Sequence, residues 1–394
     1  MEASKNKDLL SLTHTGDEYD KYLNAVVPPV FLNSLHVFKT FEAYSNINIY
    51  EEDNYVYGRD SNPTVNIVER KLAELEHGSR AVAFSSGMAA ASAAIMATCK
   101  AGSHIICLRD AYQPVKRFLN NICIPRLNMS VTYISGLDLK ELESKIQVNT
   151  SLIILESPAT FVFTVIDIKA VTDIAKRHGV KTYLDNTYCT PLFQKPLDLG
   201  VDIVMHTMSK YLGGHSDIIG GILVSKDEEL MRMIMGQMRQ WFGGIIGPME
   251  AWLVMRGMRT LDARLQQHQR TAMAVSEFLE KHPKVRKVYY TGLQSHPQHE
   301  IINRQQTGHT GLMSIELNTT PEEAVKFINN LHLFGKGCSW GGFESLALCP
   351  LYHCDEEELE FLQLTGSRGL IRLHCGLEGE ENLITDLSQA LEKV

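Results

Sequence analysis

Two residues of this chain could act together in chemistry, a lysine and an aspartate that follow separate apolar segments. Asp185 closes the segment KTYLD, and Lys210 lies further along in the string HTMSKYLGGHSD. A lysine amine can hold an aldehyde as a Schiff base, and a carboxylate can keep a pyridine nitrogen protonated so that the ring withdraws electrons from a bound amino acid. Pyridoxal phosphate carries both the aldehyde and the pyridine. A surface lysine and a helix-capping aspartate are the ordinary alternative for either residue taken alone.

Further polar or small residues follow short apolar segments elsewhere in the chain. They are Ser86, Gly87, Met88, Glu156, Thr207 and Ser209. If these segments are parallel strands, the residues meet at one carboxyl edge of a sheet, where open α/β sheets bind ligands. A helix that starts at Gly87 would offer free backbone N–H groups to a phosphate, with Ser86 as an added donor. A plain helix N-cap is the alternative for this motif.

Other side chains suit the remaining parts of a cofactor or of an amino-acid substrate. Tyr112 could stack on a pyridine ring, and Arg59, close to Tyr57, could bind a phosphate dianion. Arg372, in the alternating segment GLIRLHC, could hold a carboxylate through two parallel hydrogen bonds. Trp340 stands beside two glycines, which suggests the wall of a pocket. Core packing or a surface ion pair is the alternative for each of them.

The elements that must position these residues alternate along the chain. Between residues 56 and 225, short apolar segments alternate with amphipathic ones, which predicts a mostly parallel, buried sheet covered by helices. The expected strands are 81–84, 104–108, 131–134, 152–156, 181–185, 201–205 and 219–224. The expected helices are 64–76, 87–99, 138–146, 166–178 and 226–239.

The C-terminal part has the texture of a smaller α+β domain. A connecting helix is expected over 247–268, followed by helices at 270–281, 321–331 and 380–393 and strands at 285–289, 311–317 and 369–375. Residues 1–55 show few helix or strand signals. The chain is too long for a single core. We therefore expect an N-terminal arm (1–55), an α/β domain (56–250) and an α+β domain (251–394).

Composition limits the classes of partner and location. The 394 residues carry a net charge of −8, which argues against nucleic acid or an acidic membrane as a partner. The first residues lack the apolar core of a secretory signal, and the uncharged stretch 81–99 is rich in Ala and Ser, which favours a strand, a turn and a packed helix over a membrane span. The eight cysteines contain no CxxC pair, so we expect reduced thiols, a cytoplasmic protein and no metal site.

Several strings together resemble one enzyme family, the Cys/Met metabolism branch of fold-type I pyridoxal phosphate enzymes. They are YGRDSNPT, SSGMAA, LDNTY, SKYLGGHSD, RGMRTL, SHPQHE, GGFESL and IRLHCGLE, in the family's order. The resemblance extends from about His14 to Val394. It implies a seven-stranded, mostly parallel sheet, a smaller C-terminal α+β domain, and pyridoxal 5′-phosphate as the cofactor. It also implies an active site shared between two subunits of a homotetramer.

The resemblance implies a role for each matching residue. Lys210 matches the Schiff-base lysine, Asp185 the partner of the pyridine nitrogen, and Tyr112 the tyrosine that stacks on the ring. Phosphate-binding positions are matched by Gly87, Met88, Thr207 and Ser209, and by Tyr57 and Arg59 reaching in from a neighbouring subunit. The substrate side is matched by Ser339 and Arg372 at the α-carboxylate, with Trp340 and Cys338 beside them.

Within the family, the strings AYQP, ESP, SWGG and IRLH are most similar to bacterial cystathionine β-lyase. Cys338 departs from the glutamate of γ-type enzymes and the tyrosine of β-lyases, and Thr160 replaces a frequent asparagine. We therefore predict a carbon–sulfur β-lyase acting on L-cystathionine or a related thioether amino acid. A γ-lyase or γ-synthase, a specialised enzyme for another amino acid, and an inactive family member that serves as a binding protein are the alternatives.

Overall fold

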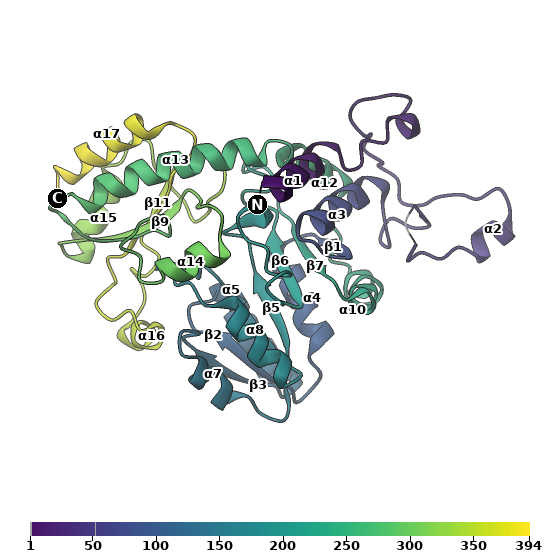
Figure 1. Cartoon of the computed structure of the whole chain (residues 1–394), viewed down its shortest axis with the longest axis horizontal. Helices are drawn as coiled ribbons and strands as arrows, with labels where there is room; N and C mark the ends of the chain where they lie inside the picture. Colours follow the sequence, from purple (N-terminus) through teal and green to yellow (C-terminus); the bar gives the residue numbers. More distant parts are fainter. Residues whose placement is uncertain (1, 52) are drawn as a thin grey trace.

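The computed structural model describes residues 2–51 and 53–394 and contains two sheets, a larger one and a smaller one (Figure 1). The larger sheet has seven strands in the order β1-β7-β6-β5-β4-β2-β3. Its strands are β1 Arg80–Phe84, β2 His104–Leu108, β3 Ser130–Ile134, β4 Thr150–Glu156, β5 Lys181–Asp185, β6 Ile203–Thr207 and β7 Gly221–Ser225. Except for the edge strand β3, these strands are mostly buried, as expected for a sheet covered on both faces.

Parallel pairing brings the strand ends that carry the candidate residues to one edge. Strands β3, β2, β4, β5 and β6 run parallel, and β7 runs antiparallel to both of its neighbours. Glu156 pairs with Asp185, and Asp185 pairs with Met205, so β4, β5 and β6 end side by side. The predicted mostly parallel α/β fold is confirmed, and the reversed β7 is the exception within it.

Strands β6, β7 and β12 (Ile371–His374) each begin two residues later than the sequence indicates, and the cause is clear for β6. We expected 201–205, whereas β6 is Ile203–Thr207. The reason is Asp202, whose carboxylate accepts hydrogen bonds from the backbone N and the hydroxyl of Thr182, at 2.8 and 2.9 Å, and from Lys181 at 3.0 Å. This side chain ties the entry of β6 to the start of β5, and the ladder begins after it.

Helices flank the larger sheet (Figure 1). They are α3 Pro63–Leu75, α4 Gly87–Thr98, α5 Gln113–Phe118, α6 Ile124–Leu127, α7 Leu139–Lys145, α8 Ile168–Arg177, α9 Thr190–Phe193, α10 Glu228–Met233, α11 Gln240–Phe242 and α12 Pro248–Met258. The uncharged stretch 81–99 forms β1, a turn and α4, as predicted. The predicted helix 226–239 is α10 followed by a π-helical segment, Ile234–Arg239.

The smaller sheet has the order β10-β11-β12-β9-β8 and its own apolar core. Its strands are β8 Val285–Tyr289, β9 Leu312–Leu317, β10 Gly335–Lys336, β11 Leu346–Leu348 and β12 Ile371–His374. The accompanying helices are α13 Leu261–Glu280, α14 His299–Gln305, α15 Pro321–Asn329, α16 Glu356–Leu362 and α17 Glu380–Leu391. Leu383, Leu387 and Leu391 recur at helical spacing on α17, and all three are fully buried in this core.

The predicted connecting helix 247–268 is wrong, because the chain breaks into α12 and α13 around Thr260. The carbonyl of Gly257 accepts hydrogen bonds from the backbone N and the hydroxyl of Thr260, at 3.2 and 3.1 Å, and from the Arg264 guanidinium at 2.8 Å. In a continuous helix this carbonyl would accept from the backbone N of the residue four positions later, but these donors occupy it instead. Helix α13 then continues to Glu280 without the second break that we expected near residue 269.

The N-terminal segment also differs from the expectation of irregular structure. Residues Glu2–His14 form helix α1, which packs against α3 with Leu12 buried. The ammonium of Lys71, itself fully buried, donates to the carbonyls of Ser11 and Leu12 at 3.0 and 3.1 Å. A lysine far along the chain therefore caps this helix, which no local pattern shows. Beyond α1, the chain forms an arm that carries α2 Phe41–Ser45 and extends away from the rest of the molecule (Figure 1).

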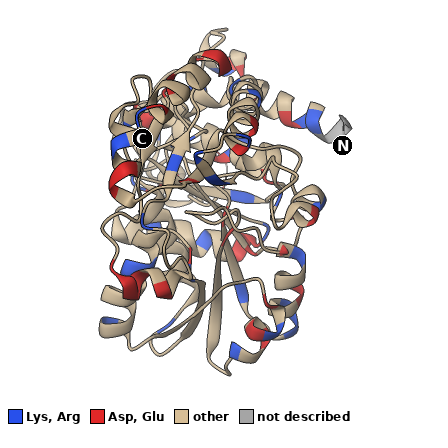
Figure 2. Ribbon diagram, turned by 90° about the vertical axis from the view of Figure 1, so that its left-hand side faces the viewer, with Lys and Arg blue, Asp and Glu red and all other residues tan. Residues whose placement is uncertain are grey.

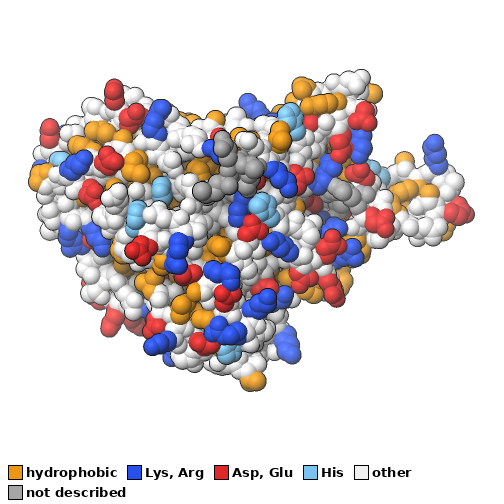
Figure 3. Space-filling view, viewed as in Figure 1, with side chains coloured by type: hydrophobic (Ala, Val, Ile, Leu, Met, Phe, Trp, Pro, Cys, Tyr) orange, Lys and Arg blue, Asp and Glu red, His pale blue; other side chains and the backbone are white. Residues whose placement is uncertain are grey.

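The surface mixes both signs of charge. Lysines and arginines alternate with acidic residues over both the ribbon and the surface views (Figures 2 and 3). Among the described residues, each helix is too short or too polar to cross a bilayer.

Candidate active site

Most of the predicted site residues line one cavity of about 490 Å³ between the two sheets. It is lined by twelve of them: Ser86, Gly87, Met88, Tyr112, Asp185, Thr207, Ser209, Lys210, Cys338, Ser339, Trp340 and Arg372. The first eight come from the carboxyl edge of the larger sheet and the last four from the smaller sheet and its loops. The residues at the strand ends of the larger sheet thus meet as predicted, and the smaller sheet adds the other four.

Lys210 lies in a mostly buried position just beyond β6. Its Nζ donates a hydrogen bond to Ser339 Oγ at 2.6 Å and lies 5.3 Å from the centre of the Trp340 ring. Burial, and then the nearby Arg372 cation, lower the pKa of Lys210 to about 8. An amine with that pKa is partly neutral, and therefore nucleophilic and basic, near physiological pH.

Asp185 and Glu156 form a buried pair of carboxyl groups at the ends of β5 and β4. Asp185 Oδ1 accepts from the backbone N and the hydroxyl of Thr187, at 2.9 and 2.5 Å. Burial raises the pKa of both carboxyl groups, and that of Glu156 well above its usual value, with the charge of Asp185 adding to the effect. The Thr187 bonds, His206 and Lys210 oppose the rise in the pKa of Asp185. Of the two carboxyl groups, Glu156 therefore has the more strongly raised pKa and holds a proton more readily than Asp185.

Glu156 also holds the segment that carries Tyr112. Its Oε2 accepts from the backbone N of Tyr112 at 2.6 Å, and its Oε1 accepts from the backbone N of Thr160 at 3.0 Å. Tyr112 opens helix α5 with its ring half-exposed over the cavity. Burial, and then the charges of Asp185 and Glu156, raise the pKa of the Tyr112 phenol, which keeps it neutral. No role was predicted for the site residues Glu156 and Thr187, although Glu156 stands at a strand end.

The first turn of α4 also lines the cavity. Ser86 is the N-cap, and its hydroxyl accepts from the backbone N of Ala89 at 3.0 Å. A Cβ on Gly87 would lie 2.9 Å from Cβ and Oγ1 of Thr207, and a Cβ on Gly221 would collide with the carbonyl of Ser86. Glycines at these two positions therefore let β6, β7 and the helix start approach closely. The result is a small cradle of backbone N–H groups and hydroxyls that suits a phosphate.

Arg372 and Ser339 form the opposite wall. The Arg372 guanidinium donates to the carbonyl of Cys338 at 2.8 Å, on the same loop as Ser339. Cys338 is an exposed free thiol that lines the cavity. A fixed guanidinium beside a hydroxyl and an amine is an arrangement that can bind an α-amino acid by its carboxylate.

Two predicted residues do not reach this cavity. Tyr57 and Arg59 lie at the base of the arm, where both are exposed and the guanidinium stands 5.4 Å from the tyrosine ring. Their expected partner is a cofactor in a neighbouring subunit, and this stays a prediction.

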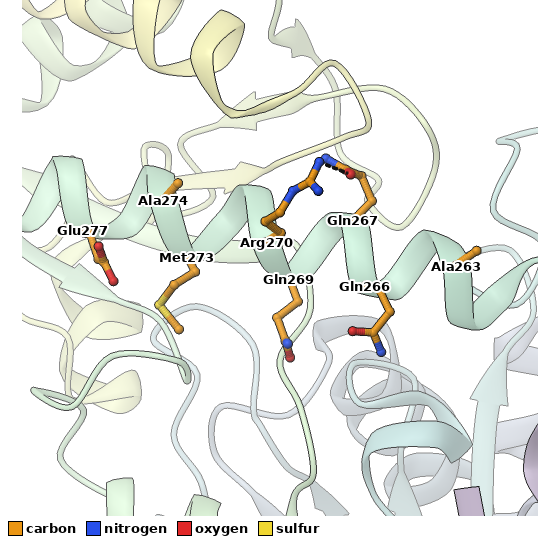
Figure 4. A pocket seen from close by; sticks show the side chains of 8 residues that line it. All are labelled: Ala263, Gln266, Gln267, Gln269, Arg270, Met273, Ala274 and Glu277. Carbon is orange, nitrogen blue, oxygen red and sulfur yellow. Dashed lines mark hydrogen bonds between the residues drawn. The ribbon is translucent and has the colours of Figure 1, made fainter. Parts of the chain in front are cut away.

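A second hollow lies along α13, where Arg270 and Gln267 are hydrogen-bonded at 2.6 Å (Figure 4). Its lining, between Ala263 and Glu277, comes from one helix and combines amides with a few charged and apolar side chains. It brings together none of the groups described above.

Comparisons with known proteins agree with the chemistry of the cavity. A family model described as Cys/Met metabolism PLP-dependent enzyme matches residues 11–392. The L-methionine gamma-lyase of Porphyromonas gingivalis is 39% identical over 382 residues, 96% of each chain. The cystathionine beta-lyase of Lactococcus lactis subsp. cremoris is 37% identical over 383 residues, 96% of this chain and 97% of that one. The crystal structure of metB from Corynebacterium glutamicum matches with a TM-score of 0.91 at 32% identity and covers 98% of each chain.

The residues present fit the cofactor of that family, pyridoxal phosphate. The cavity contains an amine of lowered pKa, a buried carboxylate whose two hydrogen bonds both reach Oδ1, and the cradle at the start of α4. These are the groups needed for the aldehyde, the pyridine nitrogen and the phosphate, respectively.

Proposed function

Because the chain belongs to the family of Cys/Met metabolism PLP-dependent enzymes, we propose that it is a carbon–sulfur β-lyase. Its substrate is L-cystathionine or a related thioether amino acid, and its products are a thiol, pyruvate and ammonia. The observation that carries the proposal is the placement of Lys210 Nζ, 2.6 Å from Ser339 Oγ and in one cavity with Arg372 and Asp185. One amine thus lies between the groups that bind the cofactor and those that bind a carboxylate.

The cofactor-binding roles follow from the chemistry of each group. Lys210 holds the aldehyde, Asp185 keeps the pyridine nitrogen protonated, and Tyr112 covers the ring. The phosphate is held by Ser86, Gly87, Met88, Thr207 and Ser209, and by Tyr57 and Arg59 of a second subunit. When bound, pyridoxal phosphate supplies an electron sink that stabilises negative charge on the substrate α-carbon.

The remaining steps belong to side chains of this chain. Arg372 and Ser339 bind the substrate α-carboxylate and so orient the Cα–H bond towards Lys210. The substrate amine would replace Lys210 at the aldehyde, and the freed amine of Lys210 takes the α-proton, a role that suits its pKa of about 8. The electron pair left at Cα forms the Cα–Cβ double bond, the sulfur leaves Cβ with the C–S pair, and Lys210 returns a proton to it. The released enamine hydrolyses to pyruvate and ammonia.

γ-Elimination is the second candidate, because an L-methionine gamma-lyase is 39% identical to the chain. It requires a second proton to be removed, from Cβ, and Lys210 is the amine in reach for that step as well. Cys338 does not separate the two candidates, since its thiol replaces both the glutamate that we associate with γ-type enzymes and the tyrosine that we associate with β-lyases.

Product analysis with L-cystathionine separates these candidates. We expect pyruvate with homocysteine. The outcome 2-oxobutyrate with cysteine would assign γ-cleavage instead. A protein that takes up pyridoxal phosphate but turns over no member of a panel of thioether amino acids would point to a different reaction. A colourless protein that binds none of the cofactor would point to the inactive-relative alternative.

A further inference from the structure

The loop that forms the substrate wall, residues 338–345, is tied along its length to β12 and the turn after it. We call it the wall loop. At its start, Arg372 donates to the carbonyl of Cys338 at 2.8 Å. Towards its end, the backbone N of Leu377 donates to the carbonyl of Phe343 at 2.8 Å, and Glu378 accepts from the backbone N and the hydroxyl of Ser345, at 2.7 and 2.8 Å.

His374 holds the middle of the wall loop. Its Nε2 lies 3.0 Å from the backbone N of Gly341 and 3.2 Å from the carbonyl of Gly342. Burial lowers the pKa of this imidazole well below its usual value, so the ring is neutral. A neutral Nε2 either accepts from Gly341 or donates to Gly342, and both contacts hold the same turn.

The turn at Gly341 packs directly against the backbone of the catalytic Lys210. Gly341 has φ of +85°, and a Cβ there would lie 2.7 Å from the backbone N of Tyr211 and 2.9 Å from the carbonyl carbon of Lys210. The Tyr211 ring packs against Trp340 and His374, with centroids 5.5 and 5.9 Å away. Ser339 and Trp340, which contact Lys210 Nζ, therefore stand just before the residue that His374 holds.

We propose that His374 is a positioning residue of this site, which fixes Ser339 and Trp340 against Lys210 and so sets the affinity for the α-carboxylate end of the substrate. The inference rests on the proposed function, in which Arg372 and Ser339 bind that carboxylate. It predicts a defect in amino-acid binding, whereas the capture of the cofactor by groups of the larger sheet stays intact.

The test compares His374→Phe, which keeps a buried ring without hydrogen bonds, with His374→Gln, whose amide can restore them. The matched control is His268→Phe. His268 belongs to the same buried cluster, and its ring centroid lies 5.2 Å from that of His374. Its Nδ1, however, is hydrogen-bonded to the carbonyl of Cys375 and not to the wall loop. Glycine is the probe, because it has the amine and carboxylate of the substrate without a leaving group. Its dissociation constant is read from the absorbance of the cofactor-loaded protein.

We expect His374→Phe to weaken glycine binding about tenfold, which corresponds to one buried hydrogen bond. His374→Gln should recover most of the affinity, and His268→Phe should leave it within twofold of the parent. In the cofactor-free protein, acrylamide should quench Trp340 more strongly in His374→Phe, measured as the difference from the same protein with Trp340→Phe.

Three results would overturn the inference. They are unchanged glycine affinity in a folded His374→Phe protein, an equal loss in His268→Phe, and no recovery in His374→Gln. None of these readouts depends on whether the bond cleaved is at Cβ or Cγ. A failure of the proposed β-lyase reaction is therefore distinguishable from a failure of the positioning role proposed for His374.

Discussion

Lys210 is a buried amine without a carboxylate bonded to it, and its acid–base behaviour follows from that setting. Its single hydrogen bond to a side chain in the described structure goes to the Ser339 hydroxyl. Desolvation is the largest cause of its lowered pKa, and Arg372 is the next. Asp185 and Glu344 pull in the opposite direction with smaller effect. Exclusion of water from the charged form of Lys210 thus favours the neutral, basic form of its amine.

The first prediction concerns the pH dependence of this amine in the cofactor-free protein. Because the folded pKa is about 8 and the ordinary value is 10.5, the neutral form of Lys210 should dominate above pH 8. Between pH 8 and 10.5 the unfolded chain binds a proton that the folded chain does not, so this group's contribution makes folding more favourable as pH rises through that window. Reductive methylation of Lys210, followed by mass spectrometry of its peptide, should show a midpoint near pH 8.

A model peptide with a single lysine is the control in the same experiment, because it reports the ordinary pKa of the amine. A Lys210 midpoint equal to that of the peptide would contradict the buried, desolvated setting of the amine.

The second prediction is that Lys210→Ala abolishes turnover and the absorbance of the cofactor joined to lysine. No other lysine lines the cavity in the described residues, so no amine can replace it. Spectra of the purified variant after incubation with pyridoxal phosphate provide the measurement, and Lys287→Ala should keep both properties. Retention of absorbance and activity in Lys210→Ala would remove the basis for the assigned role.

At the scale of elements, the wall loop requires glycine at position 341, because any other residue would add a Cβ there. Gly341 combines a positive φ with backbone atoms of Lys210 and Tyr211 closer than a Cβ allows, whereas Gly366, with φ of +79°, has open space around it. Alanine substitutions at these two positions therefore separate the free-energy cost of a positive φ from the free-energy cost of a steric clash.

The third prediction follows from this pair. Gly366→Ala should cost about 1 kcal/mol of folding free energy, the cost of a left-handed conformation. Gly341→Ala should cost more, and it should also lower kcat/KM by an order of magnitude or more, because the loop must move away from Lys210. Denaturant unfolding and steady-state kinetics measure the two effects, and equal behaviour of the two variants would show that the close approach has no consequence.

The sequence predicts elements well where one periodicity or one buried run decides them. Strands β2 and β5 lie where their apolar residues place them, and α4 starts at the SSGM motif. Prediction from the sequence fails where a contact with a distant side chain determines where an element forms or ends. Lys71 caps α1, Asp202 delays β6, and Arg264 with Thr260 ends α12. None of these contacts has a local signal.

The site shows the same division. Lys210 and Asp185 are recognisable because they follow strands, and parallel pairing makes strand ends converge. Thr187 and the hydrogen bonds of Glu156 are settled only by register and by the path of the chain after β4. The hold of His374 on the wall loop needs the pairing of β12 with β11 and is invisible in the string IRLHC.

At the scale of the molecule, the arm is the segment that a single chain does not bury. Val37 is 88% exposed, and Leu35, Phe41 and Tyr44 are also largely exposed around α2. Soluble proteins rarely leave such a group of apolar side chains in water. Tyr57 and Arg59 lie at the base of this arm, which is consistent with a second copy of the chain as its partner.

The fourth prediction is therefore self-association. Light scattering should give a multiple of 44.3 kDa, with a tetramer expected. A variant with Val37→Asp and Phe41→Ser should shift towards smaller species and lose cofactor affinity, because the proposed contact of Tyr57 and Arg59 with a phosphate in the neighbouring subunit would be lost. Val148→Asp, at a fully exposed position on another surface, should change neither property. A fully active monomer at micromolar concentration would refute the prediction.

The cavity is built by two sheets with different tasks, since Lys210, Asp185 and the α4 cradle come from one, and Arg372, Ser339 and Trp340 from the other. With the roles proposed above, the groups that bind the cofactor and those that bind the substrate are encoded in separate stretches of the gene. We expect that a chimera bearing the stretch from Val285 to the C-terminus of a relative would bind vitamin B6 as this protein does, while adopting the donor's preference among sulfur amino acids. Such grafting would let selection exchange one property without rebuilding the other.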